Sequence, residues 1–177
     1  MSFLSRLLGT GSDPREAMRP LWHRSVELAR DPHWFASCGV ADTVEGRFDM
    51  ITAVMALLLM RMENDPELVR KSVLLTEIFV EDMDGQMRQA GVGDVVVGKH
   101  MGRVMGSMGG RLGAYREAFA EPGDEALAQA VERNMSMTEA GDPACVARGL
   151  RSLAGRLAAT NDADLVAGRI VDGDLRQ

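Results

Sequence analysis

Long apolar runs are missing from this 177-residue chain. The longest covers residues 50–60 and is bounded by Asp49 and Arg61, whereas a helix needs ~20 apolar residues to cross a bilayer. The first residues also lack the apolar core and the cleavage site of a secretory signal. We therefore expect no transmembrane helix, and we expect the protein to stay in the compartment where it is made.

Cysteine and histidine are scarce. The two cysteines, Cys38 and Cys145, lie far apart without a CxxC pattern, which suits a reducing compartment, and we interpret both as small core residues. The three histidines, His23, His33 and His100, are widely separated, and no ExxH or HExxH spacing supplies a di-iron or zinc site. The sequence therefore predicts neither a metal nor another cofactor.

Catalytic motifs are also lacking. Residues 93–100 fit GxxxxGK but place His100 where a phosphate loop needs Ser or Thr, and they follow a predicted helix instead of a strand. There is no GxSxG elbow, and the acids around Asp82 are more economically a salt-bridge network than a general acid and base pair. The sequence predicts that the protein is not an enzyme.

The composition is that of one globular domain. Hydrophobic residues make up 46% of the chain and charged residues 26%, close to the averages of folded proteins. The formal net charge of -6 argues against DNA as a partner. Residues 98–116 nevertheless carry only basic charges, and we interpret them as a solvated face, with contact to phosphate, lipid or an acidic partner as the alternative. These basic residues are Lys99, Arg103, Arg111 and Arg116.

Proline marks the predicted helix starts. Asp-Pro pairs at residues 13–14, 31–32, 65–66 and 142–143 each join an N-cap residue to one favoured at the first helical position. Thr43 is a further N-cap candidate, and only residues 95–97 look extended. The sequence predicts an all-α, mostly antiparallel single domain of about six to eight helices. The expected helices are 14–30, 32–38, 43–63, 66–90, 98–120, 124–137, 143–159 and 161–168.

Two charged blocks within apolar sequence, residues 39–51 and 79–94, identify a family. Together with residues 32–35, residues 98–99 and Tyr115, they resemble the ubiquinol-cytochrome c chaperone family. The resemblance covers roughly residues 20 to 120 and fades beyond 121. It implies a non-enzymatic assembly factor that binds newly made cytochrome b, or a helper protein, during assembly of the bc1 complex.

The same resemblance implies ribosome contact, as in mitochondrial relatives. The acidic balance argues against it here, and residues 98–116 are where such contact would lie. We expect a cytoplasmic location or one at the inner face of the cytoplasmic membrane (the matrix side in a eukaryote), with at most peripheral membrane contact. A homodimer is kept as an alternative to a monomer. The alternatives are a helical interaction module with a different partner and an unrecognised small-molecule enzyme.

A buried ion pair is predicted between two helices. Residues 43–63 are apolar on several faces, so this helix is expected to be central and surrounded. Arg47 falls on one of its apolar stripes, and Asp82 falls on an apolar row of the next helix. Because an unpaired buried charge costs ~3 to 5 kcal/mol, we predict that Arg47 contacts Asp82.

The same charged blocks supply the predicted partner surface. Glu77, Glu81, Asp84 and Arg88 share one helix face, which is either solvated or partner-facing. Trp34 is either a core anchor, which we favour, or an interface hot spot. The candidate partner-binding residues are Trp34, Asp42, Arg47, Glu81, Asp82, Asp84, Arg88, Lys99 and Arg103.

Two further features bear on the domain organisation. Glycine recurs every four residues from Gly98 to Gly110, which predicts close packing of this helix or, as the alternative, a soft helix that forms a client groove. Residues 1–12 carry a short apolar stripe that can dock on the body, pair with another subunit or touch a membrane. We expect a helical chaperone-type domain over residues 13–160, followed by a short helix and tail at 161–177.

Overall fold

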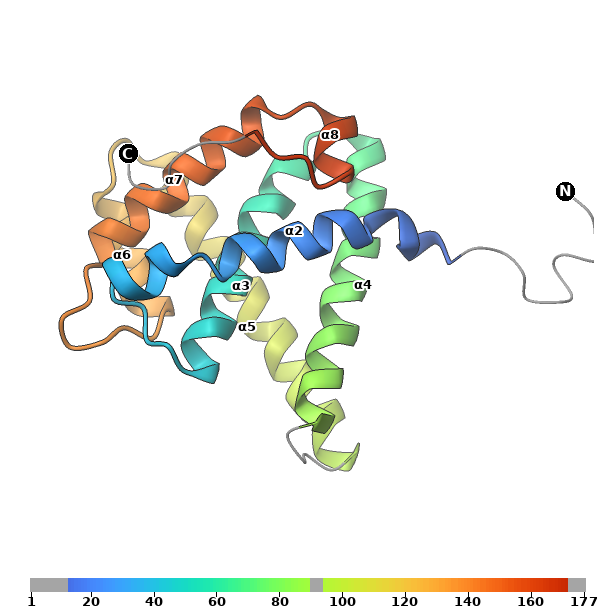
Figure 1. The fold of residues 1–177 in the computed structure, drawn as a ribbon, viewed down its shortest axis with the longest axis horizontal. Helices are drawn as coiled ribbons and strands as arrows, with labels where there is room; N and C mark the ends of the chain where they lie inside the picture. Colours follow the sequence, from blue (N-terminus) through green and yellow to red (C-terminus); the bar gives the residue numbers. More distant parts are fainter. Residues whose placement is uncertain (1–12, 90–93, 172–177) are drawn as a thin grey trace, which may run out of the picture.

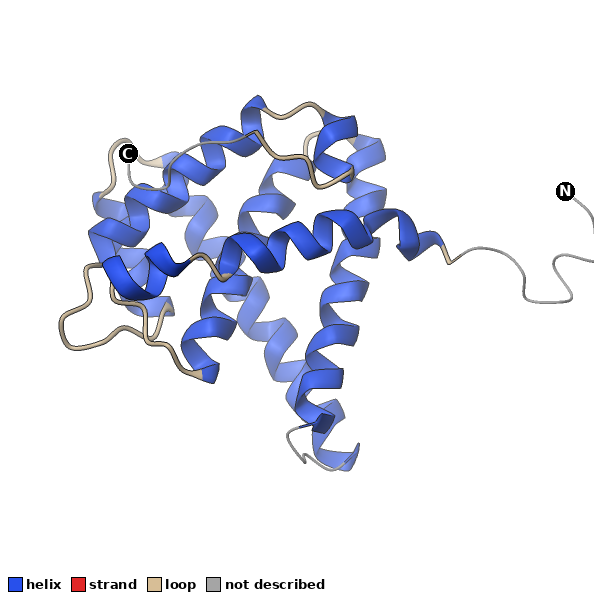
Figure 2. Ribbon diagram, in the orientation of Figure 1, coloured by secondary structure: helices blue, strands red, loops and turns tan. Residues whose placement is uncertain are grey.

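The computed structural model describes residues 13–89 and 94–171, apart from the side chains of residues 87–89, 94–105 and 107. Every regular element in these ranges is a helix (Figures 1 and 2), so the predicted all-α fold is confirmed. The elements are η1 (Pro14–Met18), α2 (Arg19–Ala29), η2 (His33–Ser37), α3 (Val44–Met62), α4 (Pro66–Gln89), α5 (Asp94–Ala120), α6 (Glu125–Asn134), α7 (Pro143–Ala159) and α8 (Asp162–Val166).

The four Asp-Pro pairs begin helices as predicted. Asp13 accepts a hydrogen bond from the backbone N–H of residue 15 at 2.9 Å, and Asp31 accepts one from that of residue 33 at 2.9 Å. Asp65 accepts from residue 67 at 2.8 Å, and Asp142 accepts from residue 144 at 2.9 Å. Each carboxylate satisfies a backbone donor that a helix leaves unpaired at its start, which is why these positions end the preceding loops.

Helix α3 is central, as predicted. It contacts α2, α4, α5 and α7, and α2 crosses in front of it while α5 passes behind (Figure 1). Thr43 caps its start by accepting the N–H of Gly46 at 3.2 Å. A Cβ on Gly46 would lie 1.9 Å from the carbonyl oxygen of Ala41, so only glycine lets the chain pass this closely.

Three details differ from the sequence predictions. Residues 95–97 belong to α5 and are not extended, because this helix begins at Asp94. Helix α6 ends at Asn134, since the following residues pair with the segment after η2 through the antiparallel bridge Val40–Met137. Cys38 and Cys145 form a disulfide instead of standing as separate core residues, because the same pairing brings η2 to the start of α7.

The prediction of close packing along the glycine row is wrong where the structure describes it. Gly106 and Gly110 are exposed, and apart from neighbouring residues and the backbone of their own helix, no described atom lies within 4 Å of the Cβ position of either residue. The row turns to solvent because α5 faces α3 with its other side, through residues such as Met108 and Tyr115. Gly98 and Gly102 lie outside the described side chains.

The end of α7 is fixed by a side chain from α3. Arg61 donates to the carbonyl oxygens of Leu157 and Thr160, each at 3.0 Å, and pairs with Asp162 at 2.6 Å. A cation at the carbonyl end of a helix satisfies acceptors that otherwise have no partner. Among the described residues, none of the helices has the length and apolar character needed to span a membrane.

Candidate functional site

A groove runs along the outer side of α4, with a volume of about 810 Å³. We call it the α4 groove. Helix α4 supplies most of its wall, α3 and α5 close one side, and η1 reaches it through Arg15. Its lining residues are Arg15, Leu59, Glu63, Val69, Ser72, Val73, Thr76, Glu77, Val80, Glu81, Asp84 and Leu112.

The floor of the groove is apolar. Val69 and Val73 are 41% and 55% exposed, and they lie four residues apart, so their side chains fall on one helix face. The hydroxyls of Ser72 and Thr76 each donate to a carbonyl of α4 itself at 2.8 Å. These hydroxyls are therefore already satisfied, and the floor offers an apolar contact surface to a ligand.

The opposite face of α4 explains why the groove is left open. That face carries the residues that join the core, among them Leu75 and Phe79, which are fully buried. Phe79 meets Trp22 of α2 edge to face at a ring distance of 6.0 Å. Because this face binds α4 to the body, the valine face remains uncovered.

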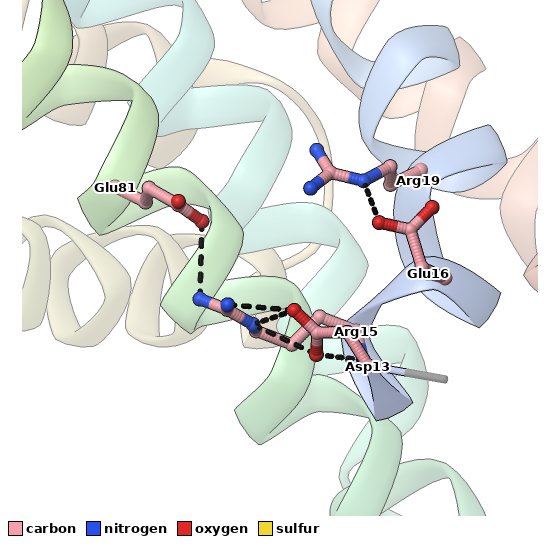
Figure 3. A network of polar contacts seen from close by, with 5 residues as sticks. All are labelled: Asp13, Arg15, Glu16, Arg19 and Glu81. Atoms are coloured by element: carbon pink, nitrogen blue, oxygen red, sulfur yellow. Dashed lines mark hydrogen bonds and ion pairs between the residues drawn. The ribbon is translucent and has the colours of Figure 1, made fainter. Parts of the chain in front are cut away.

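Acidic side chains form the rim. Glu63, Glu77, Glu81 and Asp84 all line the groove, and Arg15 is the one basic residue among the described lining side chains. Figure 3 shows how η1 delivers this cation: Arg15 is held by Asp13 at 2.6 Å and reaches across to Glu81 at 3.0 Å. Acidic groups therefore outnumber basic ones in the lining, and Glu63 and Glu81 are each paired with an arginine.

The ion pairs at the rim shift the titration of their members. The side-chain hydrogen bond from Arg15, followed by its backbone N–H, lowers the pKa of Asp13 from 3.8 to about 2. The same hydrogen bond to Asp13, with the nearby charge of Glu81, raises the pKa of Arg15. Both groups are charged at physiological pH, so the part of the groove near Glu81 is an ion-paired junction between η1 and α4.

A buried ion pair anchors the helix that closes the groove. Arg111 precedes Leu112 of the groove wall, and its guanidinium donates to Asp49 of α3 at 2.5 Å. The second oxygen of Asp49 accepts the backbone N–H and the hydroxyl of Ser136, each at 2.8 Å. Arg111 also lies over the ring of Phe48 at 5.5 Å. The cluster fixes α5 against α3.

Tyr115 lies one turn further along α5. Its side chain is buried and its hydroxyl has no hydrogen-bond partner among the described residues. Burial raises the pKa of this hydroxyl far above its usual value, with Arg111 acting in the opposite direction. The phenol therefore stays neutral and serves as a packing group.

The predicted contact between Arg47 and Asp82 is wrong. Arg47 pairs with Asp42 at 2.7 Å, and both side chains are about 60% exposed. Asp82 accepts a hydrogen bond from Gln86 one turn along its own helix at 2.9 Å. Arg47 lies in the first turn of α3, where the helix has not yet entered the core, so its charge stays in water.

The predicted partner residues separate into groups. Glu81 and Asp84 line the α4 groove, whereas Asp42, Arg47 and Asp82 do not. Trp34 is fully buried and its indole N–H donates to the carbonyl of residue 28 at 2.8 Å, so it is the core anchor that we favoured and is not exposed for partner contact.

Three other predicted partner residues, Arg88, Lys99 and Arg103, lie outside the described side chains. Of the basic residues predicted in the same segment, Arg111 is the buried partner of Asp49, and Arg116 pairs with Glu63 at 2.6 Å. The described part of this segment is therefore ion-paired, and the predicted solvated face is wrong at Arg111, which turns into the interior to meet Asp49.

Several groove residues were not singled out from the sequence. Arg15 and Leu112 come from distant elements, and their approach to α4 depends on packing. Val69, Val73 and Val80 carried a signal, because steps of four and seven residues place them beside the acidic stripe of Glu77 and Glu81. Asp49 also carried a signal in the sequence, since it stands within the first charged block next to an apolar run.

An all-helical domain with an open apolar groove and a charged rim is typical of a protein that binds other proteins. The chain belongs to the ubiquinol-cytochrome C chaperone family, which matches it over residues 36–172. This match runs well past residue 121, where the sequence resemblance fades. The crystal structure of the Cbp3 homolog from Brucella abortus is similar, with 26% identity, a TM-score of 0.81 and 99% of each chain covered. No curated protein matches the chain.

Proposed function

We propose that this protein is an assembly chaperone of the bc1 complex that holds newly made cytochrome b, or a helper protein that carries it, in the α4 groove. The observation that supports the proposal is the exposed valine face between acidic side chains in a member of this family. The protein acts by binding and not by catalysis.

The chemistry of the groove suits a segment of a membrane protein. Such segments are apolar and carry Lys and Arg at their cytoplasmic ends. Val69, Val73 and Leu112 would meet the apolar part, while Glu77 and Glu81 would meet the cations. From residue 69 to residue 84 the groove runs about 22 Å along α4, which fits a helix of roughly 15 residues laid in the groove.

The place of action follows from the client. Cytochrome b enters the membrane from the compartment where it is made, so the chaperone works there, at the inner face of the membrane. The acidic rim also favours a basic client over a surface of anionic lipid, which would be repelled. Membrane contact is therefore at most peripheral.

The test compares two matched substitutions, Val73→Asp and Val44→Asp. Both residues are exposed valines on helices, at 55% and 82%, but only Val73 lines the groove. Each change should alter the free energy of unfolding by about 0.5 kcal/mol or less, because the sites are on the surface. Tagged variants would be expressed in the native cell, and cytochrome b recovered with them would be quantified by mass spectrometry.

Wild type and Val44→Asp should recover cytochrome b, and Val73→Asp should recover at least about tenfold less, since a buried charge in an apolar contact costs more than ~1.4 kcal/mol. Equal recovery with Val73→Asp would overturn the groove as the binding site. Recovery of unrelated proteins alone, with normal bc1 complex in cells lacking the chain, would favour the helical interaction module with a different partner.

A further inference from the structure

A histidine and two cysteines meet on the side of the bundle where η2 faces the start of α7. The Nε2 atom of His33 lies 3.4 Å from the sulfur of Cys38 and 4.0 Å from the sulfur of Cys145. The two sulfurs form a disulfide between residues 107 positions apart in sequence. Cys38 is fully buried, whereas His33 and Cys145 are partly accessible. The cluster is separate from the α4 groove.

Backbone contacts hold this cluster together without help from the disulfide. The N–H of Asp142 donates to the carbonyl of Cys38 at 2.8 Å, and the N–H of Thr138 donates to that of Gly39 at 2.9 Å. Gly39 has a φ of +75°, and a Cβ there would lie 2.6 Å from the Cα of Gly141. The two segments are therefore packed so tightly that opening the disulfide leaves both sulfurs next to His33.

We propose that reduction of the disulfide converts His33, Cys38 and Cys145 into a site for Zn²⁺. Two thiolates and one imidazole are donors that this ion prefers, and two thiolate charges neutralise a divalent cation in a partly buried place. A dithiol reductant supplies two electrons and two protons, which convert the disulfide into two thiols while the reductant becomes a disulfide. Binding of Zn²⁺ then releases both thiol protons.

The geometry favours coordination. With Zn–S near 2.3 Å and Zn–N near 2.0 Å, ligand atoms in a tetrahedral site lie roughly 3.5 to 3.8 Å apart. The distances from His33 Nε2 to the sulfurs, 3.4 and 4.0 Å, bracket this range. Once the disulfide is reduced, rotation about the two Cα–Cβ bonds is enough to move the sulfurs apart to this spacing. Water completes the fourth position, as is usual where a protein supplies three ligands.

The His33 ring lies beside the Trp34 ring, with centroids 5.8 Å apart, and its polar atoms face the sulfurs on one side only. Its Nδ1 is buried without a hydrogen-bond partner there, which is unusual for a buried polar atom. No protein group holds the ring from that side, so its contacts at Nε2 are with the two sulfurs.

The test uses the same chain in two redox states. The full-length protein, reduced with a phosphine under anaerobic conditions, would be titrated with Co²⁺ and with Zn²⁺, and the oxidised protein would be the control. We expect about one ion per reduced chain, with a near-ultraviolet thiolate-to-cobalt band that Zn²⁺ abolishes, and no band from the oxidised chain. His33→Ala should weaken Zn²⁺ binding at least about tenfold, while His23→Ala, at an exposed histidine of α2, should leave it unchanged.

Two results would overturn the proposal. The first is a reduced wild type that binds no more Zn²⁺ than the oxidised chain. The second is a His33→Ala variant that binds as tightly as wild type, since this would leave the imidazole without a role. The comparison of redox states needs no substitution, so a folding defect in a variant cannot obscure it. Neither result bears on the α4 groove, which is tested by client recovery.

Discussion

Removal of the buried carboxylate of Asp49 should be among the most damaging single changes in this protein. Asp49 is 5% exposed and accepts three hydrogen bonds, one from Arg111 at 2.5 Å and two from Ser136 at 2.8 Å. The partner side chain of Arg111 is 15% exposed, so water screens the pair little. Asp49→Ala leaves a guanidinium and a backbone N–H in the interior without their acceptor.

The expected cost follows from these contacts. Breaking a buried ion pair on one side costs roughly 3 to 5 kcal/mol, because the remaining charge is uncompensated. For a domain of this size such a loss lowers the melting temperature by about 6 to 20 °C. The exposed pair of Asp42 and Arg47 is the matched control, and Asp42→Ala should cost far less than Asp49→Ala, because water screens an exposed ion pair.

The assay is urea unfolding followed by circular dichroism, applied to a double-mutant cycle of Asp49→Ala and Arg111→Met. The double variant buries no unpaired charge, so it should lose less stability than the sum of the single changes, with a coupling energy above ~2 kcal/mol. A coupling below ~0.5 kcal/mol, or an Asp49→Ala variant as stable as Asp42→Ala, would refute the view that this pair fixes α5 against α3.

Two further predictions concern glycine and pH. Gly106→Ala and Gly110→Ala should each raise the free energy of unfolding by ~0.5 to 1 kcal/mol, because alanine favours a helix and the Cβ meets no described atom beyond its own helix. Gly46→Ala should lower the free energy of unfolding, because its Cβ would clash with the carbonyl of Ala41. Urea unfolding distinguishes the two cases. Since Arg15 lowers the pKa of Asp13 to about 2, the stabilising effect of their contact should be complete above the ordinary value of 3.8 and fade as the pH falls toward 2. Carbon-13 NMR should show this low pKa and its return toward 3.8 in Arg15→Gln; an ordinary pKa in wild type would contradict the network.

Helix starts could be predicted because their physics is local. A carboxylate one residue before proline needs only its own chain to cap a helix, and all four Asp-Pro pairs do so. The central position of α3 was also predictable, since a helix apolar on several faces must be surrounded. Helical periodicity alone placed Glu77, Glu81 and Asp84 on one face. All three residues line the α4 groove.

Pairings between distant segments were not predictable in the same way. Arg47 and Asp82 each stood on an apolar stripe, but the first turn of α3 lies in water, so the buried acid is Asp49, two residues later. Its partner Arg111 sits in a glycine-rich stretch that carried no such signal. Small shifts along a helix decide burial, and periodicity alone does not locate them.

The sequence by itself determined the helices, their caps, the family and one acidic face of the groove, because these depend on neighbours within a few residues. Only the tertiary structure decided that the valine face of α4 stays open, that Arg15 reaches Glu81, and that Cys38, Cys145 and His33 meet. Those outcomes depend on which of several compatible faces pack together. The faces that pack together are set by the packing of the whole core, including close approaches between distant residues such as Gly39 and Gly141.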